Sequence, residues 1–339
     1  MRHAARLLAL AWPLIALSGS SPALAQADFY KGKTISVIVG SRVTGSMSIT
    51  AQIVTRHLGR HIPGNPTVVL RQMPGAAHLN ATNQVFNVAE ADGLTILAAN
   101  PPIAMAQLMK MPAVRFDVRQ FEWLGSTGAE GAILAIHPSL PYRTFADLKN
   151  AKVELIAGTT GPGSNAHDVP LLLSEFAGAK FKLVTGYAAN ADIRLAIERR
   201  EVDSWTSMAT TIRLASEQGL VRPLVRSSRA PVPGLNHLPV DEDLATSALG
   251  RSLMLIRGTP LGIGRPLAVR PGTPADRVAI LRDAVAAVVA DPRFQAEVKA
   301  AQIDTYHITA QEVAQRFAAM MNQTPEVLDA MVKYIKAPE

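Results

Sequence analysis

The chain has 339 residues, of which 48% are hydrophobic and 18% are charged, and this balance excludes a largely disordered protein. A length of this order predicts two domains. The absence of cysteine excludes disulfides, thiol catalysis and cysteine-based metal sites. The formal net charge of +7 is spread through the chain without interleaved aromatic residues, so we expect no nucleic acid partner.

The N-terminal 25 residues have the pattern of a secretory signal peptide. Arg2 and Arg6 precede the apolar run 7–17, and Ala23-Leu24-Ala25 supplies the small residues of a cleavage site. The alternative is a membrane anchor, but this run is too short to span a bilayer and contains Pro13. We therefore predict cleavage near Ala25 and a periplasmic protein.

Strand patterns alternate with helix patterns along the first part of the chain. The segments 33–40, 67–71 and 94–99 are predicted strands, and 49–58 and 79–88 are predicted helices. This alternation is typical of an α/β fold with mostly parallel sheets, in which ligands bind at the carboxyl ends of the strands. The loop after the first strand carries donors suited to a carboxylate, namely Arg42, Thr44, Ser46 and Ser48.

The segment 153–170 combines a strand, a glycine loop and the start of a helix. Such a loop directs backbone N–H groups and the positive end of a helix dipole toward one point, where an anion fits. The residues that define this loop are Thr159, Thr160, Gly161, Gly163 and Ser164. The alternative interpretation is an ordinary tight turn, since glycine is also the usual residue for strained backbone.

The same loop formally matches a dinucleotide fingerprint, but the rest of that motif is missing. Residues 161–166 fit G-x-G-x-x-A, whereas the next predicted strand, 182–185, ends in Gly186-Tyr187 instead of an acidic residue for the ribose. The sequence contains no serine nucleophile elbow, zinc protease motif or P-loop. We predict that the protein is not an enzyme, and an α/β enzyme or nucleotide-binding protein that uses this loop is the alternative.

The eight histidines include no pair at metal-ligand spacing among carboxylates, so neither a metal site nor a cofactor is predicted. His57 and His61 lie near the end of a helix and are interpreted as surface residues. His78 and His167 follow glycine loops, where a ligand contact and a structural role are both open. Tyr187 has the same two options, to contact a ligand or to pack the turn.

The second half of the chain continues the α/β pattern. A domain crossing is predicted near 121–128, a strand at 132–137, a helix capped by Thr144, and a helix at 167–176. The proline-rich segment 227–239 is predicted to be a return linker, and 265–269 the last strand. The final helices are expected at 276–290, 292–300, 309–320 and 325–335, the first of them with Thr273 as its N-cap.

Eight blocks of the sequence, in order, resemble the solute-binding proteins of tripartite tricarboxylate transporters, the Bug family. The most characteristic are FYKGKTISVIVG, QMPGAAHLNATNQVFNVAEADG, GTTGPGSNAH and GRPLAVRPGTPADRVAILR. The resemblance implies a two-lobed α/β fold, that of a type II periplasmic binding protein. It also implies a receptor that binds a small organic carboxylate and delivers it to the large and small subunits of a membrane permease.

On this fold, residues 26–125 would form the first part of lobe 1 and residues 126–226 would form lobe 2. Residues 227–339 would comprise the return linker and the second part of lobe 1. We expect a monomer. The implied ligand-binding residues of lobe 1 are Ser41, Arg42, Thr44, Gly45, Ser46, Ser48, Pro74, Gly75, Ala76, Ala77 and His78. Those of lobe 2 are Thr159, Thr160, Gly161, Gly163, Ser164, His167, Tyr187, Ala189, Asn190 and Asp203.

Two loops depart from the family pattern. The family usually has a run of glycines and then an aspartate in the first loop, where this chain has Thr44-Gly45-Ser46-Met47-Ser48. The second loop has Ala77-His78 where glycine and a small residue are usual. These changes restrict backbone approach to the ligand, and Arg42 would compensate through a bidentate contact with a carboxylate. A degenerate binding protein that acts as a sensor or scaffold is a further alternative.

Overall fold

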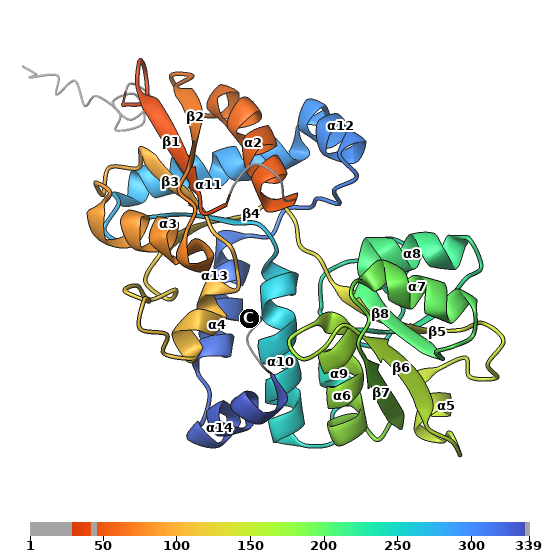
Figure 1. The fold of residues 1–339 in the computed structure, drawn as a ribbon. Coiled ribbons are helices and arrows are strands. Elements are labelled where there is room, and N and C mark those ends of the chain that lie inside the picture. Colours follow the sequence, from red (N-terminus) through yellow and green to blue (C-terminus); the bar gives the residue numbers. More distant parts are fainter. Residues whose placement is uncertain (1–28, 42–45, 336–339) are drawn as a thin grey trace, which may run out of the picture.

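The computed structural model describes residues 29–41 and 46–335 (Figure 1). These residues form two five-stranded sheets that are covered by helices. The predicted signal peptide, residues 1–25, and the candidate ligand residues Arg42, Thr44 and Gly45 lie outside the described residues. Within the described residues, no helix is both long enough and apolar enough to cross a membrane.

Sheet A consists of β1 (Thr34–Val39), β2 (Thr67–Gln72), β3 (Thr95–Ala98), β4 (Glu122–Ser126) and β10 (Pro266–Val269). The strand order is β2-β1-β3-β10-β4. β1 is parallel to β2 and β3, whereas β10 runs antiparallel to β3 and β4. Threonine, isoleucine and valine make up most of β1, and such β-branched residues favour a strand.

Sheet B consists of β5 (Ala132–Ile136), β6 (Leu155–Thr159), β7 (Phe181–Thr185), β8 (Ser204–Met208) and β9 (Arg222–Arg226). The strand order is β7-β6-β8-β5-β9. β6 is parallel to β7 and β8, whereas β5 runs antiparallel to β8 and β9. In both sheets, therefore, three neighbouring strands are parallel, the fourth is antiparallel to them, and the fifth is antiparallel to the fourth. The predicted α/β fold with two units is confirmed.

Helices cover the faces of both sheets. With sheet A lie α2 (Ser46–Leu58), α3 (Leu79–Asn83), α4 (Ile103–Leu108), α11 (Ala275–Ala290), α12 (Pro292–Ala300) and α13 (Ala310–Met321), whereas α14 (Pro325–Tyr334) lies away from the sheet, at the bottom of Figure 1. With sheet B lie α5 (Phe145–Lys149), α6 (Asn165–Ala177), α7 (Asn190–Glu198), α8 (Ala209–Glu217) and α9 (Asp241–Leu244). Shorter helical turns cover Gly59–His61, Ala76–His78 and Gln84–Val88. A further helix, α10 (Ala248–Ile263), lies between the two groups in Figure 1.

Helix α10 joins the two units through one apolar core. It packs against α6 and α9 on one side and against α13 and α14 on the other. Leu253 and Ile256 of α10 belong to a buried cluster that contains both Trp123 of β4 and Leu173 of α6. Because burial of apolar surface is the main stabilising contribution in a fold, this shared core holds the units together at one side.

Two chain connections cross between the sheets beside α10. The segment 127–131 leads from β4 to β5, and Gly264-Arg265 leads from α10 to β10. Ser126 Oγ lies 2.7 Å from the Ile263 carbonyl oxygen and accepts a hydrogen bond from the Arg265 amide at 3.0 Å. Gly264 has a φ of 69°, and a Cβ there would overlap the Gly128 carbonyl. Glycine is required here because the two connections touch through their backbones.

The structure corrects two local predictions. His57 is not a surface residue, because it is 5% exposed and its Nε2 lies 2.7 Å from Glu297 Oε2 of α12. His61 also contacts this region, with Nε2 3.0 Å from Asp291 Oδ2. Thr273 is not the N-cap of α11, since the cap position is Pro274 and Thr273 Oγ1 donates to the Arg270 carbonyl at 2.8 Å.

Candidate ligand-binding site

The residues directly after β1 lie beside those directly after β2. These strands are parallel and in register, with Val39 opposite Gln72, so their carboxyl ends meet at one edge of sheet A. Ser41 Oγ lies 2.5 Å from Ser48 Oγ, and Ser48 is fully buried in the first turns of α2. This contact ties the end of β1 to α2. Ser46, another predicted ligand residue, is the first residue of α2.

The second loop adopts an uncommon backbone conformation. After Pro74, which is exposed, Gly75 has a φ of 133°, and Ala76, Ala77 and His78 have φ values of 44°, 48° and 75°. Left-handed backbone costs a non-glycine residue roughly 1–2 kcal/mol. Three such residues in succession identify a strained turn, and strain of this kind concentrates at functional sites.

His78 connects the second loop to the first. A Cβ on Gly40, which follows β1, would lie 2.7 Å from His78 Cβ, so the histidine packs directly on the glycine backbone. Its Nδ1 is buried and makes no hydrogen bond within the described residues. Burial lowers the pKa of His78, so its imidazole is neutral at neutral pH. The structure therefore brings together Ser41, Ser48 and His78 at the carboxyl edge of sheet A.

We expect Ala77→Gly to stabilise the protein by about 1 kcal/mol, because glycine accepts a positive φ without the steric cost of a Cβ. The expected rise in Tm is roughly 2–4 °C for a chain of this size. Thermal unfolding followed by circular dichroism measures it. The matched control is Ala191→Gly, at an exposed position in the first turn of α7, where glycine should lower Tm. A lower Tm for Ala77→Gly would contradict the strained-turn interpretation.

The glycine loop between β6 and α6 has the predicted strand, loop and helix order. Gly161 and Gly163 have φ values of 115° and 86°, a region that favours glycine. Ser164 is the N-cap of α6, and its Oγ accepts from the His167 amide at 3.2 Å. The same Oγ donates to the Gly161 carbonyl at 2.7 Å, and the Gly161 amide donates to Thr159 Oγ1 at 3.2 Å. The loop is therefore folded by its own hydrogen bonds.

Asp168 is the residue at this loop that the sequence analysis missed. It is 1% exposed, and its Oδ1 accepts a hydrogen bond from the Gly163 amide nitrogen at a distance of 3.0 Å. His167 Nδ1 also lies 3.0 Å from this oxygen. Asp168 Oδ2 forms an ion pair with Arg257 of α10 at a distance of 3.3 Å from Nε. Backbone donors that were expected to hold a ligand anion are thus partly occupied by a carboxylate of the chain itself.

The remaining predicted residues on sheet B have mainly structural contacts. Tyr187 packs on Gly158, where a Cβ would lie 3.3 Å from its ring. The Ala189 amide donates to Asp192 Oδ2 at 2.9 Å, and Asn190 Oδ1 lies 3.4 Å from Trp205 Nε1. Asp203 accepts from the Ile156 amide at 2.8 Å, near the amino ends of β6 and β8. The structure therefore does not bring Asp203 to the carboxyl edge, where Thr159 lies.

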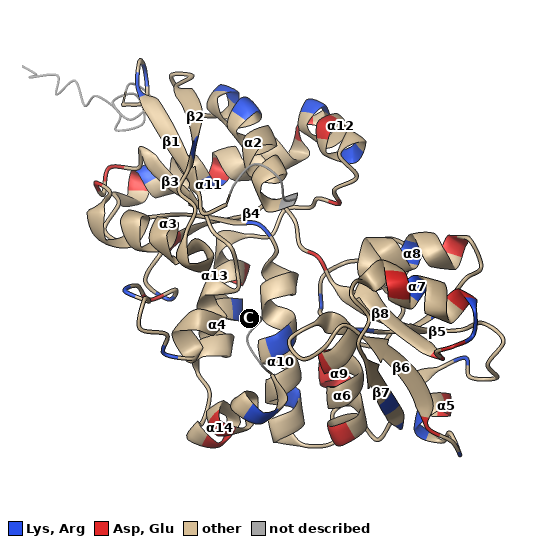
Figure 2. Cartoon of the chain, viewed as in Figure 1, with Lys and Arg blue, Asp and Glu red and all other residues tan. Residues whose placement is uncertain are grey.

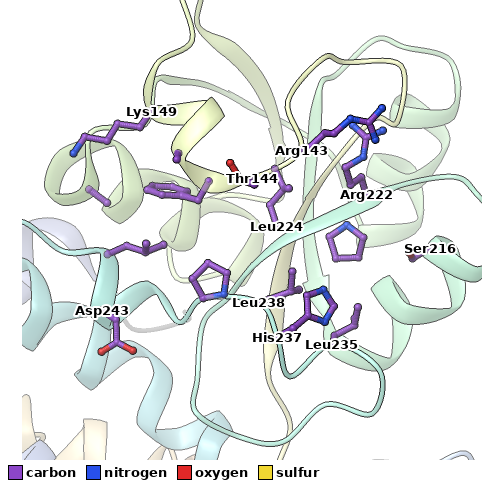
Figure 3. A pocket seen from close by; sticks show the side chains of 16 residues that line it. Arg143, Thr144, Lys149, Ser216, Arg222, Leu224, Leu235, His237, Leu238 and Asp243 are labelled. Atoms are coloured by element: carbon purple, nitrogen blue, oxygen red, sulfur yellow. The ribbon is translucent and has the colours of Figure 1, made fainter.

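Two cavities that the described residues line lie away from these loops. The larger, about 780 Å³, lies between α5, β9 and the segment 235–244 (Figure 3). Figure 3 shows Lys149 at one end, Arg143 and Arg222 at the other, and Leu224 and Leu238 between them. The Arg222 guanidinium is already used, because it donates to the carbonyls of Leu140 and Tyr142 at 3.0 and 2.8 Å. The second cavity, about 550 Å³, lies beside β4. Neither contains a predicted ligand residue.

Two α/β units joined by crossing connections, with loops at the carboxyl ends of parallel strands, define the class of two-lobed solute-binding proteins. Residues 55–332 match the tripartite tricarboxylate transporter family receptor, TctC. This match covers most of the sequence, so the chain belongs to the TctC family. The family assignment from sequence blocks is thereby confirmed. The comparison with curated proteins gives no match.

Solved structures show the same fold at low sequence identity. A TctC solute-binding protein from Polaromonas, without ligand, is 17% identical with a TM-score of 0.71, and the alignment covers 90% of this chain and 99% of that one. An R. palustris protein with adipate is 20% identical with a TM-score of 0.51, covering 88% and 96%. MatC from Rhodopseudomonas palustris with bound malate is 17% identical with a TM-score of 0.51, covering 87% and 99%.

Proposed function

We propose that the protein is an exported solute-binding protein that captures a small organic carboxylate and delivers it to a tripartite tricarboxylate-type permease. The observation that carries this proposal is the TctC family match over residues 55–332. The related structures with adipate and malate support a carboxylate as the ligand. The protein acts as a monomer in the periplasm, after removal of residues 1–25, and docks on the large and small permease subunits.

The carboxylate binds at the loops of sheet A. Ser41 offers a hydroxyl, the turn Gly75–His78 offers backbone N–H groups, and the His78 ring offers a neutral side-chain donor or acceptor. Arg42, which lies outside the described residues, supplies the positive charge for a bidentate contact. Closure of the two units around the ligand then excludes water and strengthens these contacts. The ligand is bound and released without chemical change.

A nucleotide is a poorer ligand for the loop before α6. Phosphate binding at a helix N-terminus requires free backbone donors and no competing anion. Here the Gly163 amide already donates to the buried carboxylate of Asp168. A phosphate would have to displace that carboxylate or lie beside its negative charge. The dinucleotide alternative therefore loses its structural basis as well as its ribose acid.

Mass spectrometry of small molecules released from the natively purified protein tests the function. We expect a small organic acid, and we expect the same acid to raise the Tm of ligand-free protein as its concentration increases. Nucleotides serve as the matched negative panel and should leave Tm unchanged. The proposal is wrong if nucleotides stabilise the protein while every carboxylate in the panel is inert. If both panels are inert, a sensor or scaffold role is favoured.

A further inference from the structure

The larger cavity lies at the edge of sheet B opposite to the glycine loop. Arg222 of β9 pairs with Ile136, which pairs with Ser204 at the amino end of β8, whereas Thr159 ends the parallel strand β6 at the carboxyl edge. The volume of about 780 Å³ is in the range of small-molecule sites, roughly 300–1,000 Å³. Exposed residues such as Ala146 line the cavity, so it opens to solvent.

The walls of this cavity are mostly apolar. Leu224 and Leu238 form its buried part and are 2% and 9% exposed. Pro223, Leu235 and Leu244 also line it and are only half-buried, so that apolar surface remains open to solvent. Covering such surface with the apolar part of a ligand is favourable, because it removes the surface from water.

Arg222 supplies a fixed positive charge at one end of the cavity. Its Nη1 donates to the Leu140 and Tyr142 carbonyls at 3.0 and 2.8 Å, and its Nη2 donates to the Pro138 carbonyl at 2.9 Å. These acceptors are neutral. In the part of the chain that the structure describes, no carboxylate lies within ion-pair distance of this guanidinium.

Arg143 adds a second positive charge at the same end. It follows Tyr142 in the chain, it is exposed, and its guanidinium makes no ion pair or hydrogen bond with the described residues. Figure 2 shows both acidic and basic residues on and beside α5, but the acid of this helix, Asp147, accepts the backbone amides of Arg143 and Thr144. The two guanidinium groups therefore lack a counter-ion.

The charge of the cavity lining is positive. Asp243 is the one acid among the described residues that line the cavity, and both of its carboxylate oxygens accept from Arg229, at 2.7 and 3.1 Å. Lys149 lies at the other end, where Figure 3 shows its ammonium group directed away from the cavity. An anionic group is therefore favoured at the end that holds the two guanidinium groups.

We propose that this cavity is a second binding site, for a small amphipathic molecule with an apolar body and a single acid group. The acid group lies at Arg143 and Arg222, and the apolar body lies against Leu224, Leu235 and Leu238. The site goes beyond the proposed function, because it shares no residue with the loops that bind the transported carboxylate and is independent of them.

Calorimetric titration with two amphipathic acids, octanoate and 2-naphthoate, tests the site. Ala146→Glu places a carboxylate in the cavity, and an acid is tolerated there because Ala146 is exposed in the first turn of α5. Ala191→Glu is the matched control, because Ala191 has the same position in α7, also one residue before an aspartate that accepts a backbone amide, but lies outside the cavity.

We expect Ala146→Glu to weaken at least one of the two acids at least tenfold and Ala191→Glu to change their binding less than twofold. Both variants should keep the Tm of the unaltered protein within a few degrees. Equal binding of the acids to the unaltered protein and to Ala146→Glu would overturn the proposal, and so would no heat from either acid. Either result leaves carboxylate capture by the other site intact.

Two further ligands test the chemistry of recognition. Octanamide has the chain of octanoate without its charge, and we expect it to bind at least tenfold more weakly. Butyrate has the charge without the long chain, and Ala146→Glu should not change its binding. Octanamide that binds as tightly as octanoate would overturn the need for an anion. Butyrate that Ala146→Glu weakens as much as octanoate would overturn the need for an apolar body.

Arg143→Gln tests the position of the acid group. We expect this variant to weaken octanoate at least fivefold, while Arg293→Gln, which removes an exposed arginine on α12, should leave octanoate binding unchanged. Octanoate binding that is the same for both variants would overturn the assignment of the acid group to Arg143.

An acidic membrane lipid shares the chemistry of a free amphipathic acid, and sedimentation with vesicles distinguishes the two sources. We expect the protein to stay in the supernatant with both phosphatidylglycerol and phosphatidylcholine vesicles. Sedimentation with phosphatidylglycerol vesicles that Ala146→Glu abolishes, without binding of either free acid, would assign the cavity to a membrane lipid and overturn the proposal of a free ligand.

Discussion

Replacing Arg257 with methionine should lower the free energy of unfolding by about 3–5 kcal/mol, the cost of leaving a buried charge without its partner. Asp168 is 1% exposed, and Arg257 is the one arginine or lysine within ion-pair distance of it in the described part of the chain. Arg257 also holds Asn165 at the start of α6, so the variant should loosen the glycine loop as well. Urea unfolding at neutral pH measures the change.

A double variant tests whether Arg257→Met loses stability because a charge is left unpaired or because packing is lost. Arg257→Met with Asp168→Asn removes both charges, and we expect it to recover most of the lost stability. The matched control is Arg194→Met, which removes the exposed pair between Arg194 and Glu198 at 2.9 Å. Exposed pairs contribute about 0–1 kcal/mol, so this variant should unfold almost as the unaltered protein does. A similarly small effect of Arg257→Met would show that the pair with Asp168 is not a stabilising contact.

The second large effect concerns the pH dependence of stability. Asp241 has its pKa raised from 3.8 to about 8, first by burial and then by the Glu242 carboxylate. Between pH 3.8 and about pH 8, Asp241 is protonated in the folded state and ionised in the unfolded state. The stabilisation that this proton provides is complete below pH 3.8 and is lost as pH rises toward 8. Asp241→Asn cannot ionise, so at pH 8 it should be more stable than the unaltered protein by a few kcal/mol, and the difference should shrink toward pH 4.

Denaturant unfolding at a series of pH values measures this difference. Asp147→Asn is a control of opposite sign, because hydrogen bonds from the Arg143 and Thr144 amides lower the pKa of Asp147. Its carboxylate stabilises the fold above its ordinary pKa, and the asparagine variant should therefore be less stable at neutral pH and equally stable in acid. A stability gain for Asp241→Asn that stays constant from pH 4 to pH 8 would contradict a raised pKa for Asp241.

The alternating part of the fold could be predicted from sequence because its signals are local. β1 is predicted at 33–40 and found at Thr34–Val39, and α12 is predicted and found at Pro292–Ala300. Helix α10 was not predicted. It is apolar on most sides and contains three glycines and a proline, a composition that does not show helical periodicity. The structure explains two of the glycines, because a Cβ on Gly258 would overlap the Ser227 carbonyl and a Cβ on Gly250 would overlap Phe176 Cβ.

The local structure of the glycine loop could be predicted from the sequence, whereas its buried charges could not. The order of strand, glycine loop and helix start was predicted from local sequence and is observed, with Ser164 as the N-cap of the helix. Asp168 has the sequence pattern of an ordinary acidic residue in a helix first turn. Its burial and its pairing with Arg257 depend on where α10 packs, which no local pattern encodes. The burial of His57 could not be predicted for the same reason, because its partner Glu297 lies on a helix near the other end of the chain.

Calorimetric titration of small organic acids into the exported, ligand-free protein tests carboxylate capture most directly. We predict saturable binding of a carboxylate at one site per chain and no heat from nucleotides. Binding of a nucleotide, together with no heat from any carboxylate added to the same folded protein, would contradict it.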